Sequence, residues 1–114
     1  MSDIRQARKA LTSRILEGDG QASPAERRAA FNKGGLAEPL DTLVDKVAGN
    51  AYSVTEEDFT AARKSGLSED QVFEIVVCAA IGEATRQYET ALAALDAATG
   101  TQPGRSEHAA SNPR

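Results

Sequence analysis

Residues 55–82 read TEEDFTAARKSGLSEDQVFEIVVCAAIG and contain two helix starts separated by a tight corner. Thr55 and Ser68 can each cap a helix, and each is followed three residues later by an acid or amide side chain that can bond back to the cap. Gly66 stands where a residue with positive φ normally closes a helix. The stretch therefore predicts one short helix before the corner and one long helix after it, from about Glu69 to Ala98.

Three more helices are predicted upstream of this stretch. Apolar residues recur at helical spacing over residues 4–15 and again over residues 36–48. Between these segments, Ser23 precedes a proline at the first helical position and a glutamate three residues after the cap, and Gly34-Gly35 is expected to end that helix. No segment alternates apolar and polar residues as a half-buried strand does. We therefore expect an all-α fold, a small bundle of about five helices with a long C-terminal helix.

The domain organisation follows from length and composition. A chain of 114 residues has room for one domain, which we expect to cover residues 1–99. After Gly100 the chain is rich in Thr, Gln, Pro, Gly, Ser and Asn and has no periodic apolar residues. Residues 100–114 are therefore predicted to be a disordered tail.

Charge is distributed unevenly along the chain, whose formal net charge is −4. Residues 1–35 carry 7 Lys and Arg against 4 Asp and Glu, whereas residues 36–98 carry 4 against 12. The N-terminal cations are not interleaved with aromatic residues, and the main body is acidic, unlike a nucleic-acid-binding domain. We therefore interpret the basic residues as solvated helix faces and predict no nucleic-acid partner.

Other function classes are disfavoured by what the sequence contains. No stretch approaches the roughly 20 apolar residues of a membrane span, and the charged residues 1–9 are not followed by the apolar region of a signal peptide. We therefore predict a cytoplasmic protein without a membrane partner. Cys78 is the only cysteine and His108, in the polar tail, the only histidine, so we expect no metal site and no cofactor.

The long helix also predicts a protein partner. From Val72 to Ile81 it is apolar on nearly every side, and such a helix must be covered all round. Aromatic residues are only 4% of the chain, so a few short helices rich in small and aliphatic residues are too little to cover it. We therefore predict a homo-oligomer with this helix at the interface, or a larger protein partner.

Residues 43–95 resemble the repeating unit of the carboxymuconolactone decarboxylase / alkylhydroperoxidase-D-like (AhpD-like) superfamily. The resemblance lies in the short helix, the Gly-Leu-Ser-Glu corner and the long Ala-rich helix, and covers about half of the chain. The residues that carry it are Val54–Phe59, Ala61–Glu74, Ala79–Gly82 and Arg86. It implies an AhpD-like helical bundle.

The redox motif of that superfamily is missing from this sequence. Redox members carry Cys-x-x-Cys near the start of the short helix and a histidine one turn on, the first cysteine reducing peroxide and the second resolving it. Here Asn50-Ala51-Tyr52-Ser53 stand at the corresponding positions, with Glu57 near that of the histidine. Neither Asn nor Ser can supply a thiolate. Two alignments stay open, because the segment is also similar to the cysteine-free repeat of two-repeat members.

Four residues are weak candidates for a catalytic site: Tyr52, Glu57, Glu83 and Arg86. Glu83 and Arg86 stand three apart and share a helix face, where an ion pair at an oligomer interface is the favoured interpretation. An acid such as Glu57 is expected in a first helical turn from the macrodipole alone, and Tyr52 can be an amphipathic cap on a helical interface. Cys78 lies in the most apolar turn of the long helix, where its thiol is expected to be protonated and inert.

These observations lead to three hypotheses about function. The first is a non-redox carboxymuconolactone-decarboxylase-like protein that acts as an oligomeric scaffold or as an accessory subunit of a larger enzyme or pathway. The alternative is a cofactor-free enzyme similar to the lactone decarboxylase branch, in which Glu57, Glu83 or Tyr52 would perform acid–base chemistry on a small carboxylated substrate. A thiol peroxidase is the third and least favoured hypothesis.

Overall fold

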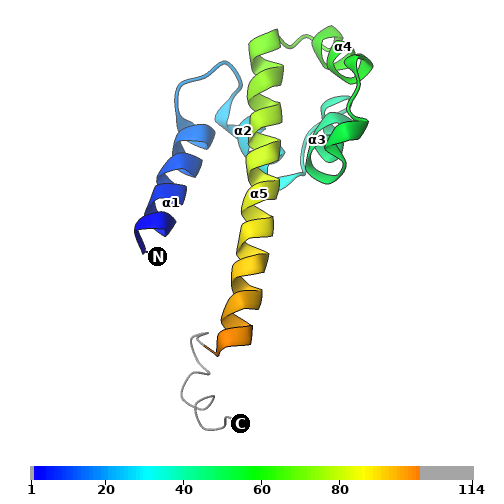
Figure 1. Ribbon diagram of the computed structural model, residues 1–114. Helices are drawn as coiled ribbons and strands as arrows, with labels where there is room; N and C mark the ends of the chain where they lie inside the picture. The colour runs from blue at the N-terminus through cyan, green and yellow to red at the C-terminus, as the bar shows by residue number, and fades with distance from the viewer. Residues whose placement is uncertain (1, 101–114) are drawn as a thin grey trace. The chain divides into compact units, whose positions relative to one another are not determined.

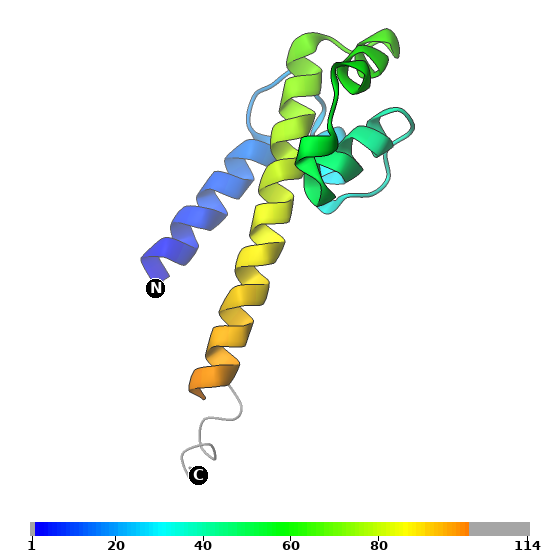
Figure 2. The ribbon, with the colours of Figure 1, turned by 45° about the vertical axis from the view of Figure 1, so that its right-hand side comes forward.

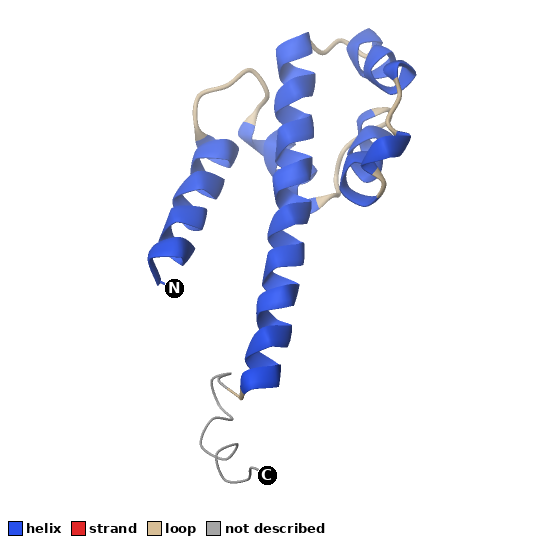
Figure 3. Ribbon diagram, in the orientation of Figure 1, coloured by secondary structure: helices blue, strands red, loops and turns tan. Residues whose placement is uncertain are grey.

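The computed structural model describes residues 2–100, in which the regular secondary structure is helical and no strand occurs (Figures 1 and 3). Five α-helices and one 3₁₀ turn follow one another along this part of the chain. They are α1 (Ser2–Glu17), α2 (Pro24–Asn32), α3 (Leu40–Gly49), the 3₁₀ turn η1 (Ala51–Ser53), α4 (Glu56–Lys64) and α5 (Glu69–Thr99). The predictions of an all-α protein and of a long C-terminal helix are confirmed.

The chain divides into two compact units, Met1–Glu83 and Ala84–Arg114, and the boundary falls within α5. The first unit contains α1 to α4 and the first half of α5. The described part of the second unit is the rest of that helix and Gly100. The single domain expected over residues 1–99 stays a prediction, and the tail predicted over residues 100–114 lies, beyond Gly100, outside the described residues.

The core of the first unit is built from small and aliphatic side chains. Every one of the five α-helices contributes to it, and the largest fully buried side chains are those of Leu43, Val44, Ile75 and Cys78. Figures 1 and 2 both show α1 on one side of α5 and α3 and α4 on the other. The first half of α5 is therefore the element around which this unit is organised.

Gly82 lets α2 and α5 approach closely. A Cβ atom added at Gly82 would lie 2.1 Å from the carbonyl oxygen of Phe31, near the end of α2. No real contact is that short, so only a residue without a side chain fits between the two backbones. Gly82 therefore fixes the packing of α2 against α5.

Three predicted helix starts, those after Ser23, Thr55 and Ser68, are confirmed. Ser23 and Thr55 each form a complete capping box, the first with Glu26 and the second with Asp58. At the corner, the backbone N–H of Ser68 donates to the Gln71 side chain at 2.7 Å, and the N–H of Gln71 donates to the Ser68 hydroxyl at 3.1 Å. Gly66 has a φ of 111°, as a helix-closing glycine requires.

Two helix boundaries differ from expectation. The helix expected over residues 36–48 begins only at Leu40, because Pro39 disfavours helical geometry at the residue before it and stands at the cap position. The second helix ends at Asn32, and the residue that takes the left-handed conformation is Lys33, with a φ of 60°. This conformation lets the N–H of Gly34 donate to the carbonyl oxygen of Ala29 at 3.0 Å. The left-handed residue therefore comes one position before the expected Gly34-Gly35 pair.

Among residues 2–100, none of the helices combines the length and the hydropathy needed to cross a bilayer.

Candidate functional site

Tyr52 and Glu57 lie on the surface of the first unit. Tyr52 is in η1 and is 86% exposed, and Glu57 is exposed in the first turn of α4. Neither side chain lines the two surface depressions described below. Neither depression therefore brings these two candidates together.

Glu83 and Arg86 lie on α5, on either side of the boundary between the two units. Both are half-buried, and neither lines the two depressions. The ion pair expected between them stays a prediction.

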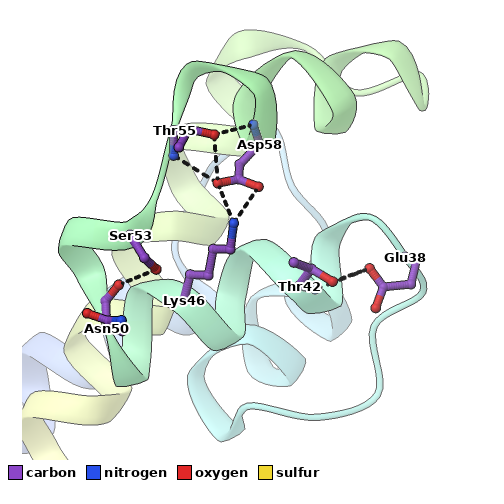
Figure 4. Close-up of polar contacts among 7 residues, drawn as sticks. All are labelled: Glu38, Thr42, Lys46, Asn50, Ser53, Thr55 and Asp58. Carbon is purple, nitrogen blue, oxygen red and sulfur yellow. Dashed lines mark hydrogen bonds and ion pairs between the residues drawn. The ribbon is translucent and has the colours of Figure 1, made fainter.

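The turn formed by residues 50–53 is held by a local hydrogen bond. Asn50 caps the end of α3 and is followed by η1. The Ser53 hydroxyl donates to the carbonyl oxygen of Asn50 at 2.7 Å (Figure 4). The Ser53 side chain therefore serves the turn itself.

Beside this turn, one ion pair connects α3 to the start of α4. The Lys46 ammonium donates to both carboxylate oxygens of Asp58, at 3.0 and 3.1 Å, and Asp58 also accepts from the backbone N–H of Thr55 at 2.8 Å (Figure 4). The N–H of Thr55, and after it the Lys46 ammonium, hold the pKa of Asp58 below its ordinary value of 3.8. Asp58 is therefore ionised near neutral pH and used in holding α4 to α3.

A small depression of about 190 Å³ lies beside α1, α2 and α5. Its lining includes two oppositely charged residues, Arg27 and Glu74. Arg27 is only 5% exposed, and its guanidinium donates to the carbonyl oxygens of Ala22 and Ile15, each at 3.1 Å. Glu74 accepts from the backbone N–H groups of Gln21 and Ala22 at 2.7 to 2.9 Å. Both side chains therefore fasten the segment between α1 and α2, which is a structural task.

The pKa of Glu74 is lowered from its ordinary value of 4.5 by this arrangement. Burial acts in the opposite direction, but it is outweighed by the two N–H donors and by the positive charge of Arg27. Glu74 is therefore ionised near neutral pH and not set up as a general acid.

Cys78 is the only cysteine of the chain and is 1% exposed. Burial raises the pKa of its thiol; the charge of Arg27 lowers it and that of Glu74 raises it further. The thiol is therefore protonated and shielded, which confirms the interpretation of Cys78 as a core residue.

A groove of about 760 Å³ lies between α4 and α5 and is called here the α4/α5 groove. Its walls come from one face of each helix, Glu56, Phe59, Thr60 and Arg63 on α4 and Glu69, Val72, Phe73 and Val76 on α5. Phe73 is 65% exposed and Phe59 39% exposed. The α5 wall is apolar apart from Glu69 at its start, whereas the α4 wall has Phe59 and Thr60 in its middle and the charged Glu56 and Arg63 at its ends.

Each wall of the α4/α5 groove is a stripe of residues along one helix, and the corner at Gly66 connects the two helices. The capping boxes at Thr55 and Ser68 fix where α4 and α5 begin, and Gly66 turns the chain between them. On each helix the lining residues have the same spacing, at a first position and then three, four and seven residues later. Residues with this spacing share one helix face.

The sequence predicts a covered apolar helix that includes Phe73 and Val76, and this stays a prediction; the α4/α5 groove was not predicted. The position of the α4 lining residues opposite those of α5 depends on the angle at the corner, which the sequence does not show. The signal in the sequence is the shared spacing of residues 56, 59, 60 and 63 before Gly66 and of residues 69, 72, 73 and 76 after it, each set with one phenylalanine.

Among the described residues, no three His, Cys, Asp or Glu side chains gather as a metal site would require. Comparison of the chain with protein-family models, with curated proteins and with solved structures gives no match in any of the three.

Proposed function

We propose that this protein is a non-redox oligomeric scaffold or accessory subunit that binds a protein partner through the α4/α5 groove. The observation that carries the proposal is the exposure of Phe73, which is 65% accessible on the wall of a groove of about 760 Å³. Grooves of this kind, with apolar walls between two helices and charges at the rim, are typical sites for an amphipathic helix.

The energetics of exposed aromatic residues support this assignment. Burying a phenylalanine side chain is worth roughly 1.5–3 kcal/mol. A small domain is stable by only about 5–15 kcal/mol in total, so two exposed phenylalanines in one groove are a considerable loss unless a partner covers them. Apolar patches rimmed by polar residues commonly mark interaction sites.

The same proposal places the chain in the non-redox part of the AhpD-like superfamily. Its support is the resemblance of residues 43–95 together with the observed order of short helix, glycine corner and long helix, Glu56 to Thr99. The buried Cys78, whose pKa is raised, fits a protein that does not use a thiol.

The proposal is tested by replacing Phe73 and comparing the result with a matched change elsewhere on α5. Leu95 is the control, because it is another large apolar side chain on α5, is 57% exposed and lies outside the groove. We expect the wild type and Leu95→Ser to elute as oligomers in size-exclusion chromatography with light scattering at micromolar concentration. Phe73→Ser should elute mainly as a monomer with an unchanged circular dichroism spectrum.

Two results contradict the proposal. One is a wild-type protein that has the mass of a single chain at all accessible concentrations and binds no other protein. The other is a Phe73→Ser variant that keeps the wild-type mass, because the groove would then play no part in association.

A further inference from the structure

The wall of the α4/α5 groove that belongs to α4 is a single exposed helix face. Glu56, Phe59, Thr60 and Arg63, called here the α4 face, line the groove, and all four residues are exposed. The last three stand three, four and seven residues after the first, so all four lie on one side of the helix. The α4 face has an acid at its start, a base at its end, and an aromatic ring and a hydroxyl group between them.

The charges at this groove have no ionic partner within the described chain. Neither Glu56 nor Arg63 makes an ion pair within residues 2–100, and neither does Glu69 on the α5 wall. Glu56 and Arg63 stand about 10.5 Å apart along the helix axis, further than the three or four residues that separate neighbouring side chains on a helix. Both ends of the α4 face are therefore available to a charge on another molecule.

The α4 face is complementary to itself when a second α4 lies against it antiparallel. With a two-fold axis midway between residues 59 and 60, residues 56 and 63 are equally far from the axis. Glu56 of each copy then comes opposite Arg63 of the other, once at each end of the contact. A parallel arrangement would instead place Glu56 beside Glu56 and Arg63 beside Arg63. The charges therefore favour an antiparallel pair of identical helices.

A second pair of charges on α4 is arranged in the same way. Glu57 and Lys64 are exposed and stand seven residues apart, so they share one flank of the helix. The two-fold axis brings this flank of both copies together, with Glu57 offset by about 3 Å along the helix axis from Lys64 of the second copy. The acidic first turn of each α4 therefore lies beside the basic last turn of the other. Charge pairs at an exposed rim determine the orientation and register of an interface more than its strength.

The attraction between the copies comes from the apolar side chains at the centre of the contact. Phe59 lies next to the midpoint of the α4 face, so the two-fold axis brings the Phe59 side chains of both copies together. Phe59 is 39% exposed, and Phe73 on the α5 wall is 65% exposed. An α4 helix that lies along the mouth of the groove removes part of this aromatic surface from water, and buried aromatic side chains dominate the energetics of interfaces.

From these observations we infer that two copies of this chain associate through their α4 helices, packed antiparallel about a two-fold axis between Phe59 and Thr60. Each α4 then covers the α4/α5 groove of the other copy. The inference rests on the proposed function and names the occupant of its groove. The same patch is used on both copies, so the assembly closes as a symmetric dimer.

Single charge reversals test whether the two ends of the α4 face meet. In a symmetric dimer, Glu56→Arg places two cations opposite each other at both ends of the contact, and Arg63→Glu places two acids there. Each variant should raise the dissociation constant by about tenfold or more in sedimentation equilibrium at low ionic strength, because two attractions become two repulsions. The matched control is Glu89→Arg, the same charge change at an exposed position outside the groove lining. It should associate within about threefold of wild type.

An equimolar mixture of the two variants separates a contact between copies from a change within one copy. Both substitutions also oppose the macrodipole of α4, so weaker association alone does not prove that the charges meet. In a mixed dimer, one chain has cations at positions 56 and 63 and the other has acids, so opposite charges face each other at both ends. The mixture should therefore associate within about threefold of wild type, although each chain keeps its substitution. Each variant should keep the wild-type circular dichroism spectrum.

The outcomes separate this inference from the proposed function. If either charge variant keeps the wild-type mass while Phe73→Ser loses it, the groove binds another surface and only the inference is wrong. If both charge variants dissociate and their mixture does not recover, Glu56 and Arg63 do not meet across the axis and the inference is wrong again. A monomeric wild type that binds another protein through the groove contradicts the inference alone. A monomeric wild type that binds no other protein removes both proposals.

Discussion

Glu74 shows how one side chain can fix the course of a whole segment. Its carboxylate accepts from the backbone N–H groups of Gln21 and Ala22, and so holds the loop between α1 and α2 against α5. In the sequence, Glu74 is a charged residue within an apolar run. Nothing near it in the sequence indicates that Gln21 and Ala22, some fifty residues earlier, are its partners. Only the folded chain brings the donors to it.

The loss of this acceptor should be visible in the pH dependence of stability. We expect Glu74→Gln to lower the free energy of unfolding near pH 7 by about 0.5–1.5 kcal/mol, as for a partly exposed charge-assisted hydrogen bond. The folded-state pKa lies below the ordinary 4.5, so the stabilisation is present above pH 4.5 and is lost as pH falls through the folded-state value. Urea unfolding at several pH values should therefore show the two proteins converging in acid.

The control for Glu74→Gln is Glu89→Gln, an exposed position on the same helix. It should leave the wild-type pH profile unchanged. A difference between Glu74→Gln and wild type that persists or widens below pH 3 would show that the carboxylate does not act through its ionised form.

Gly82 provides a second test at the level of one residue. Gly82→Ala should cost about 1–3 kcal/mol of stability, the range of overpacked sites, because the new methyl group collides with the Phe31 carbonyl. Gly49→Ala is the matched control: a Cβ there meets no atom within 4 Å, so helix propensity alone should leave stability equal or higher. Chemical denaturation measures both, and equal stabilities of the two variants would contradict the close packing of α2 on α5.

At the scale of elements, the helix boundaries that the sequence predicts correctly are those set by capping residues and turn glycines close to them in the chain. The capping residues Ser23, Thr55 and Ser68 and the corner Gly66 act within a few residues, so the sequence was sufficient to place the starts of α2, α4 and α5. The start of α3 was expected four residues too early, because apolar spacing outweighed the effect of Pro39. The α4/α5 groove was not predicted: the shared spacing of its lining residues is visible in the sequence, but the angle between α4 and α5 is not.

Helix α4 forms one wall of the groove, and removing its N-terminal cap tests what holds the start of this helix in place. Thr55→Ala removes the hydroxyl that accepts the N–H of Asp58, and should lower stability by about 0.5–2 kcal/mol. Glu57→Gln, in the same exposed first turn, should change it by less than about 0.5 kcal/mol. Thermal unfolding followed by circular dichroism compares the two, and an equal effect would mean that the capping box does not hold the helix start.

At the scale of the whole molecule, the sequence predicts that α5 is covered by a partner, but it does not predict which residues of α5 remain exposed. The expected interface included Phe73 and Val76, which line the α4/α5 groove, and also Val77 and Ile81, which are half-buried in the described chain. Oligomerisation stays a prediction because it depends on a second chain. Family membership stays a prediction because it depends on relatives of this sequence.

We propose that the α4/α5 groove mediates self-association, and the mass of the protein in solution tests this proposal most directly. One chain has a mass of 12.0 kDa. Sedimentation equilibrium of the wild type should give a mass of at least two chains at micromolar concentration. A mass of one chain at every concentration and salt would contradict the account.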